Sequence, residues 1–169
     1  EDVKRTEMEL WEKIKSKSLG GRRTGLGITA EGDMLAALGM RYGSDKAIDF
    51  AVEVQKSLAV EAYRSSVNMA AERGAFPIYD TKREEHNPMI DRIRTADPAL
   101  YELMAKVGRR NISLLTIAPT GTTSLMTQTT SGIEPVFLPF YIRRRKVNPN
   151  DLNAVITFKD DVGDCWEEY

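Results

Sequence analysis

The sequence predicts a mixed α and β fold, with helices in the first two thirds of the chain and strands in the last third. Apolar residues recur at helical spacing among charged ones up to residue 106, whereas short β-branched and aromatic runs follow residue 110. Over 169 residues, 41% are hydrophobic and 29% are charged. This composition is typical of a globular chain large enough to bury a core.

Two helices are predicted in the N-terminal part of the chain. Apolar residues near helical spacing predict the first over residues 3–18, and the glycine pair Gly20 and Gly21 should end it. A second, short helix is predicted over residues 30–38, with Thr29 as its N-cap.

The longest predicted helix covers residues 45–73. Ser44 can cap its first turn, and Gly74 can end it. At about 1.5 Å per residue, the helix would be roughly 40 Å long. Two rows of apolar residues widen its apolar stripe, which favours an internal packing element over a lone surface helix.

A polar stretch over residues 81–98 predicts a loop that contains a short helix. Pro98 suits a first helical position, and Asp97 before it suits a cap. They predict a helix over residues 99–106, which Gly108 should end.

The strands are predicted from residue 112 onward. Residues 112–117 form an apolar, β-branched run that reads as a buried strand, and it stops at Pro119, which cannot donate a ladder hydrogen bond. Three further strands are predicted, the last two joined by a hairpin turn at 160–164: 136–147, 154–158 and 165–169.

A small, hydroxyl-rich turn, Thr120-Gly121-Thr122-Thr123-Ser124, separates that first strand from a helix predicted to begin at Leu125. The first N–H groups of a helix lack partners, and the helix dipole favours negative charge there. Because hydroxyl groups would add further donors, the natural ligand of such a turn is a phosphate group.

The same turn admits a purely structural interpretation, since Ser and Thr at a helix start are first of all caps. It is not a Walker A loop, because no Gly-Lys-Ser/Thr follows, and it is not a dinucleotide-binding GxGxxG turn. The local pattern therefore leaves a phosphate site and a helix cap both open.

Three segments together give the chain a specific resemblance. They are LLTIAPTGTTSLMTQTTSGIEPVF at 114–137, GRRTGLGITAEGDMLAALGMRYG at 21–43 and AYRSSVNMAAERGAFP at 62–77. In order and spacing they resemble the large chain of ribonucleotide reductases, most closely its adenosylcobalamin-dependent (class II) branch. The first segment is similar to the loop that binds the substrate diphosphate in that family.

The resemblance implies that residues 1–169 are a partial catalytic barrel domain, a helix-rich fragment of a ten-stranded α/β barrel. The run 112–117 would be a barrel strand with the threonine-rich turn at its mouth. Both ends of the chain look cut, so we expect a longer reductase. That enzyme would convert ribonucleoside diphosphates to deoxyribonucleotides by radical chemistry with adenosylcobalamin. The piece alone should be inactive.

The resemblance also assigns the substrate-binding residues. They are Pro119, Thr120, Gly121, Thr122 and Thr123, whose N–H groups and hydroxyls would hold the terminal phosphates. Gly121 would leave room for a phosphate to approach the backbone. We expect two neighbours to be structural rather than phosphate ligands, namely Ser124 in the helix and Glu134 in the second half of the motif.

No catalytic or metal-binding residue is expected in this chain. The only cysteine, Cys165, does not resemble the radical-cysteine motif of the family, and the only histidine, His86, is expected in a surface loop. The family's catalytic residues, redox cysteine pair and cobalamin contacts match nothing here. The basic clusters at 22–23 and 143–146 are expected to be solvated faces or ion pairs.

Two positions depart from the family's usual pattern. Glu31 stands where a small or apolar residue is more usual, which puts the local packing in question. Thr123 stands at a position that is often apolar. Neither change breaks the phosphate motif.

The expected partners are a ribonucleoside diphosphate and the rest of the reductase chain. A net charge of −1 points to neither nucleic acid nor an anionic membrane surface. The single cysteine suits a reducing cytoplasm, and exposed apolar edges would favour a homodimer. Two rival functions stay open: a stand-alone phosphate- or nucleotide-binding module, and a purely structural domain without reductase activity.

Overall fold

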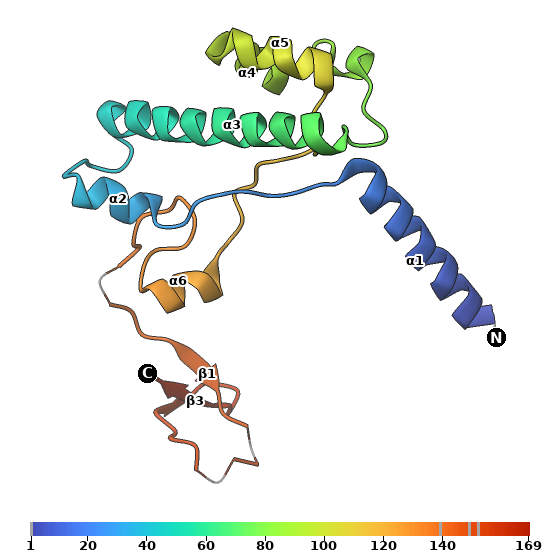
Figure 1. Ribbon diagram of the computed structural model, residues 1–169. Helices are drawn as coiled ribbons and strands as arrows, with labels where there is room; N and C mark the ends of the chain where they lie inside the picture. The colour runs from blue at the N-terminus through green and yellow to red at the C-terminus, as the bar shows by residue number, and fades with distance from the viewer. Residues whose placement is uncertain (1, 139, 149, 152) are drawn as a thin grey trace. The chain divides into compact units, whose positions relative to one another are not determined.

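A computed structural model describes residues 2–138, 140–148, 150–151 and 153–169. The chain divides into two compact units, Glu1–Pro135 and Val136–Tyr169. Figure 1 traces the course of the chain. The larger unit holds α1 (Asp2–Gly21), α2 (Glu31–Ala37), α3 (Asp45–Arg73), a 3₁₀ turn η1 (Thr81–Glu84), α4 (Pro88–Ala96), α5 (Pro98–Val107) and α6 (Gly121–Thr127). The smaller unit holds β1 (Arg144–Lys146), β2 (Phe158–Lys159) and β3 (Cys165–Glu168).

Helix α3 has the predicted boundaries and is the central element of the larger unit. The Ser44 hydroxyl accepts a hydrogen bond from the Ala47 N–H at 3.3 Å, and the Gly74 N–H closes the last turn on the Ala70 carbonyl. One face of α3 packs against α4 and α5. The buried core on this face consists of Ala59, Ala62, Tyr63, Val67, Ile90, Ile93, Leu100, Met104 and Leu114.

The caps of α4 and α5 lie where prolines begin the helices. Pro98 is the first residue of α5, and the Asp97 carboxylate accepts a hydrogen bond from the Leu100 N–H at 2.9 Å. The predicted cap, start and glycine stop of this helix are therefore confirmed. In α4, Asn87 plays the same capping role toward the Met89 N–H at 3.0 Å.

Two N-terminal expectations are wrong. Helix α1 runs through Gly20 and Gly21 instead of ending before them. Thr29 does not cap α2, because the N-cap residue is Ala30, which takes a left-handed conformation with φ 64° and leaves the cap without a side-chain hydrogen bond. The Thr29 hydroxyl is bonded instead to a residue far along the chain, which is described with the candidate site.

The predicted strand 112–117 is extended but forms a single parallel bridge, between Leu26 and Leu115. On one side, the Leu26 N–H donates to the Leu114 carbonyl at 2.7 Å and the Thr116 N–H donates to the Leu26 carbonyl at 2.9 Å. A strand needs pairing along its length, and only one neighbour is present here. The described residues therefore do not form a barrel.

The smaller unit is a three-stranded antiparallel sheet with the order β1-β3-β2. The predicted strand 165–169 and the turn before it are confirmed. The predictions for 136–147, which includes position 139 outside the described residues, and for 154–158 were too long. Of these two stretches, only residues 144–146 (β1) and 158 (in β2) pair with the short central strand β3.

Three residues of the second basic cluster lie on β1 and form ion pairs, as expected, whereas Arg143 before the strand donates to the Tyr141 hydroxyl at 2.8 Å. Arg144 and Arg145 pair with Glu168 and Glu167 of β3, at 2.7 and 2.6 Å. Lys146 pairs with Asp164 at 2.5 Å. Among the described residues, no helix is both long and apolar enough to cross a membrane.

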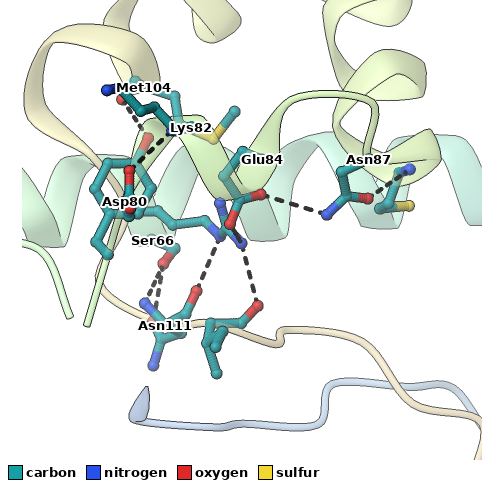
Figure 2. A network of polar contacts seen from close by, with 11 residues as sticks. Ser66, Asp80, Lys82, Glu84, Asn87, Met104 and Asn111 are labelled. Carbon is teal, nitrogen blue, oxygen red and sulfur yellow. Dashed lines mark hydrogen bonds and ion pairs between the residues drawn. The ribbon is translucent and has the colours of Figure 1, made fainter. Parts of the chain in front are cut away.

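A buried polar network joins α3 to the segment that leads to the candidate site (Figure 2). Ser66, fully buried on α3, donates its hydroxyl to the Asn111 side-chain carbonyl at 2.9 Å and accepts the Asn111 N–H at 3.1 Å. Asn111 in turn donates to the Arg22 carbonyl at 2.9 Å. The network thereby holds the starts of both extended segments against α3.

Arg109 completes the network from a site where it is only 2% exposed. Its guanidinium donates to Glu84 at 2.9 Å and to the carbonyl of Asn111 at 3.1 Å. It also lies between aromatic rings, 5.4 Å from the ring centre of Phe76 and 5.7 Å from that of Tyr63. Burial raises the pKa of the Tyr63 phenol, and the Arg109 charge opposes that rise.

We expect Arg109→Met to destabilise the protein by about 3 kcal/mol, because it leaves the Glu84 carboxylate in a mostly buried position without its partner. Arg83→Met is the control, since the Arg83 guanidinium is exposed and lies 3.9 Å from its nearest carboxylate. Denaturant unfolding measures both. Equal losses of stability in the two variants would contradict the structural role of Arg109.

The stability of α5 should depend on pH through Asp97. The Leu100 N–H, and then Arg64, hold the pKa of the Asp97 carboxyl below its ordinary value of 3.8. The stabilisation is therefore complete above that value and is lost as the pH falls through the lower pKa of the folded state. We expect the stability difference between wild type and Asp97→Asn to shrink between pH 7 and pH 3. A stability difference that stays constant over this pH range would contradict the stabilising role of the Asp97 carboxylate.

Candidate functional site

The threonine-rich turn is the first turn of α6 rather than a turn before it. The helix begins at Gly121, four residues earlier than Leu125, where it was predicted to begin. Thr120 is the N-cap residue, and its carbonyl accepts the first helical hydrogen bond, from the Ser124 N–H at 2.8 Å. The backbone of this turn is therefore fixed by the helix itself.

Three backbone N–H groups point out of this first turn without a protein acceptor. They belong to Gly121, Thr122 and Thr123, and no hydrogen bond joins them to any residue that the structure describes. All three residues are exposed. Such groups at a helix start bind either water or a ligand with acceptor oxygens.

The four hydroxyl groups of the turn separate into two kinds. Thr120 donates to the Thr29 hydroxyl at 3.0 Å, and Ser124, 7% exposed, donates to the Gly121 carbonyl at 2.8 Å. Within the described part of the chain, the hydroxyls of Thr122 and Thr123 have no hydrogen-bond partner. These two hydroxyls are the donors that an incoming anion can reach.

The structure does not support the alternative in which the Thr120 hydroxyl caps the helix. No side-chain cap hydrogen bond is formed at this N-cap, and the Thr120 hydroxyl turns to Thr29 instead. Pro119, just before it, is exposed and has no N–H of its own. The first turn of α6 is therefore left open rather than closed by its own side chains.

The segment at the start of α2, residues 29–33, holds the far end of the loop. The Thr29 hydroxyl donates to the Thr130 carbonyl at 2.9 Å, and the Ala30 N–H donates to the same carbonyl at 3.2 Å. The Thr130 N–H donates to the Asp33 carboxylate at 2.8 Å. The Glu31 N–H donates to the Gly132 carbonyl at 3.2 Å. Residues 120–132 are thus tied to 29–33 at both ends.

Close backbone packing reinforces these hydrogen bonds. A Cβ atom on Gly32 would lie 2.5 Å from the Glu134 carbonyl oxygen and 2.6 Å from the Pro135 Cα. The side chain of Glu134 is exposed and makes no hydrogen bond with the described residues, so its backbone is what supports the loop.

Glu31 is accommodated in a way that the sequence did not reveal. It is only 6% exposed, and its carboxylate accepts a hydrogen bond from the Gln55 side chain of α3 at 2.7 Å. The buried carboxylate at this position is therefore satisfied by a polar contact between α2 and α3.

The other candidates from the sequence lie outside this site. Arg22 donates to the Ala75 carbonyl at 3.1 Å, which is a structural contact. His86 is exposed in a loop, as expected, and Cys165 is a half-buried free thiol on β3. Among the described residues, no three His, Cys, Asp or Glu side chains gather to hold a metal.

A hollow of about 1000 Å³ in the larger unit also lies apart from the loop. It opens between α3, α4 and the paired extended segments. Its lining includes Val52, Ala59, Met89, Ile93, Leu115 and Ile117. An apolar lining of this kind suits side chains rather than a phosphate group, so we place the candidate site at α6.

Comparison with known proteins gives the family. The model of the ribonucleotide reductase barrel domain matches residues 4–162. The chain therefore belongs to this family, and the resemblance noted in the sequence is confirmed.

Several named relatives agree with this family. The vitamin B12-dependent ribonucleoside-diphosphate reductase of Mycobacterium tuberculosis is 35% identical over 123 residues, which cover 72% of this chain and 15% of that protein. The protein of the same name from Thermoplasma acidophilum is 31% identical over 133 residues, 78% of this chain and 15% of that protein. The ribonucleoside-diphosphate reductase subunit alpha of Chlamydia pneumoniae is 30% identical over 148 residues, 76% and 14%. The chain spans about one seventh of the length of these relatives.

The contact at Gly32 makes a further prediction. Gly32→Ala should push the backbone at 134–135 away from α2, at a cost of about 1–3 kcal/mol. Gly20→Ala is the matched control, because its new Cβ would meet only the Ile78 side chain at 3.6 Å. Amide hydrogen exchange at the Glu31 N–H reports the local opening. An unchanged exchange rate in Gly32→Ala would contradict this packing.

Proposed function

We propose that this chain is part of the catalytic chain of a ribonucleotide reductase that converts ribonucleoside diphosphates to deoxyribonucleotides by radical chemistry. We propose further that residues 119–123 bind the substrate phosphates. The observation that carries the second proposal is the set of three unpartnered N–H groups at Gly121, Thr122 and Thr123. They lie in a chain that matches the barrel domain of this family.

The geometry supports a division of roles within the loop. The N–H groups of Gly121, Thr122 and Thr123 would donate to phosphate oxygens, and the two free threonine hydroxyls would add donors at the rim. Nothing lies within 4 Å of a Cβ placed on Gly121, so a phosphate can approach the backbone there. Hydrogen bonds to a charged acceptor are about twice as strong as neutral ones.

Binding of the phosphates would serve positioning rather than bond breaking. A substrate held by its phosphate end presents its ribose at a fixed place, which lowers the entropy cost of the reaction. No residue of this chain resembles the radical cysteine of the family, and Cys165 lies on a strand of the smaller unit. The chemical steps are therefore assigned to the rest of the polypeptide.

Adenosylcobalamin is our proposed radical source, supported by the vitamin B12-dependent names of the relatives from Mycobacterium tuberculosis and Thermoplasma acidophilum. When bound, this cofactor supplies the radical that begins the reaction. The family's cobalamin contacts match no segment of this sequence, so we propose that its site lies elsewhere in the protein. A homodimer and a cytoplasmic location remain part of the same proposal.

The test uses the full-length protein with the double substitution Thr122→Val and Thr123→Val. We expect the affinity for a ribonucleoside diphosphate to fall about 10- to 100-fold, because hydrogen bonds to a charged group are lost. The affinity for the same nucleoside without phosphates should stay unchanged. Calorimetric titration measures both ligands, and Thr122→Ser with Thr123→Ser is the control that keeps the hydroxyls.

Equal weakening of the nucleoside and the diphosphate would contradict a phosphate-specific role. An unchanged diphosphate affinity would favour the structural interpretation of the loop.

A further inference from the structure

Thr29 of the 29–33 segment and Thr120 of the loop form a directed chain of hydrogen bonds. The Thr120 hydroxyl donates to the Thr29 hydroxyl at 3.0 Å, and the Thr29 hydroxyl donates onward to the Thr130 carbonyl at 2.9 Å. Because each hydroxyl has one proton, the Thr120 proton is committed to Thr29. The Thr120 hydroxyl therefore orients the loop and has no proton left to donate to a phosphate.

Asp33 fixes the other side of the same loop. Its carboxylate accepts the Thr130 N–H at 2.8 Å, so Thr130 is held through its N–H by Asp33 and through its carbonyl by Thr29. The loop between these anchors contains the whole of α6. Its N-terminal turn cannot shift without breaking a bond to Thr29, and its C-terminal return cannot shift without breaking a bond to Asp33.

The 29–33 segment is itself held by helix α3. Glu31, between the two anchoring residues, is buried and bonded to Gln55 of α3 at 2.7 Å. Gly32 packs directly against the backbone of Glu134 and Pro135. These contacts fix the position of the loop relative to α3, the longest helix of the unit.

We propose that Thr29 and Asp33 are positioning residues for the phosphate site: they hold the N–H groups of residues 121–123 in a phosphate-binding arrangement by acting through Thr120 and Thr130. The proposal rests on the proposed function of the loop. It adds two residues that the sequence pattern did not assign to the site. A loop that is ordered before the ligand arrives loses less entropy on binding, which raises affinity.

Loss of Thr29 or Asp33 should weaken binding of the phosphates and leave binding of the unphosphorylated nucleoside unchanged. Thr29→Val keeps the shape of the side chain but removes both its hydrogen bonds, and Asp33→Ala removes the acceptor for Thr130. We expect each to raise the Kd of a ribonucleoside diphosphate about three- to tenfold. Thr29→Ser keeps the hydroxyl and Asp33→Asn keeps an acceptor oxygen, so each should retain most of the affinity.

The experiment titrates the full-length protein and these four variants with a ribonucleoside diphosphate and with the unphosphorylated nucleoside. Amide exchange at the Thr130 N–H is measured in parallel, because a loosened loop should exchange faster in Thr29→Val and Asp33→Ala. General unfolding would weaken the binding of both ligands equally, so the ratio of the two Kd values isolates the contribution of the phosphates.

The outcomes separate the two proposals. If the Thr122→Val, Thr123→Val double variant loses diphosphate affinity while Thr29→Val and Asp33→Ala keep it, the loop binds phosphate and the positioning role is wrong. If the double variant also keeps its affinity, the proposed function of the loop is wrong. If Thr29→Val and Asp33→Ala weaken the nucleoside as much as the diphosphate, the role of the anchors is structural only, which also overturns the positioning proposal.

Discussion

The arrangement of the larger unit depends on the buried polar contact between Ser66 and Asn111. It sets the start of the segment 112–117 against α3, and the Asn111 side-chain amide donates a hydrogen bond to the Arg22 carbonyl. The two extended segments then run in parallel and pair at Leu26 and Leu115. Ser66 and Asn111 are both buried, so an unpaired polar group on either side chain would cost more than the pair contributes. The contact therefore specifies one register for the two segments.

The candidate site follows from where those two segments end. One leads to Thr29 and the start of α2, and the other leads to Thr120 and the start of α6. Because the segments run in the same direction, both helix starts lie at the same end of the pair, where Thr29 and Thr120 meet at 3.0 Å. The unpartnered N–H groups of α6 are thus held by a scaffold that reaches back to α3, which suits a site built to position a substrate.

How much of this could be predicted from the sequence depends on how local the cause is. The ends of α3 and α5 were predicted correctly, since Ser44 and Asp97 cap residues only three positions away. Thr29 was misassigned as a cap because its true partner, Thr130, lies 101 residues along the chain. The strands were predicted too long because pairing needs neighbours that an apolar run cannot reveal. The loop itself was found through its motif, whereas Asp33 and the buried Glu31–Gln55 contact carry no local signal.

The most direct test is a crystal structure of the full-length protein with a ribonucleoside diphosphate bound. We predict that phosphate oxygens lie within about 3 Å of the backbone nitrogens of Gly121, Thr122 and Thr123. We also predict that the Thr120 hydroxyl stays bonded to Thr29. A diphosphate bound away from α6, with these N–H groups still facing water, would contradict the central claim.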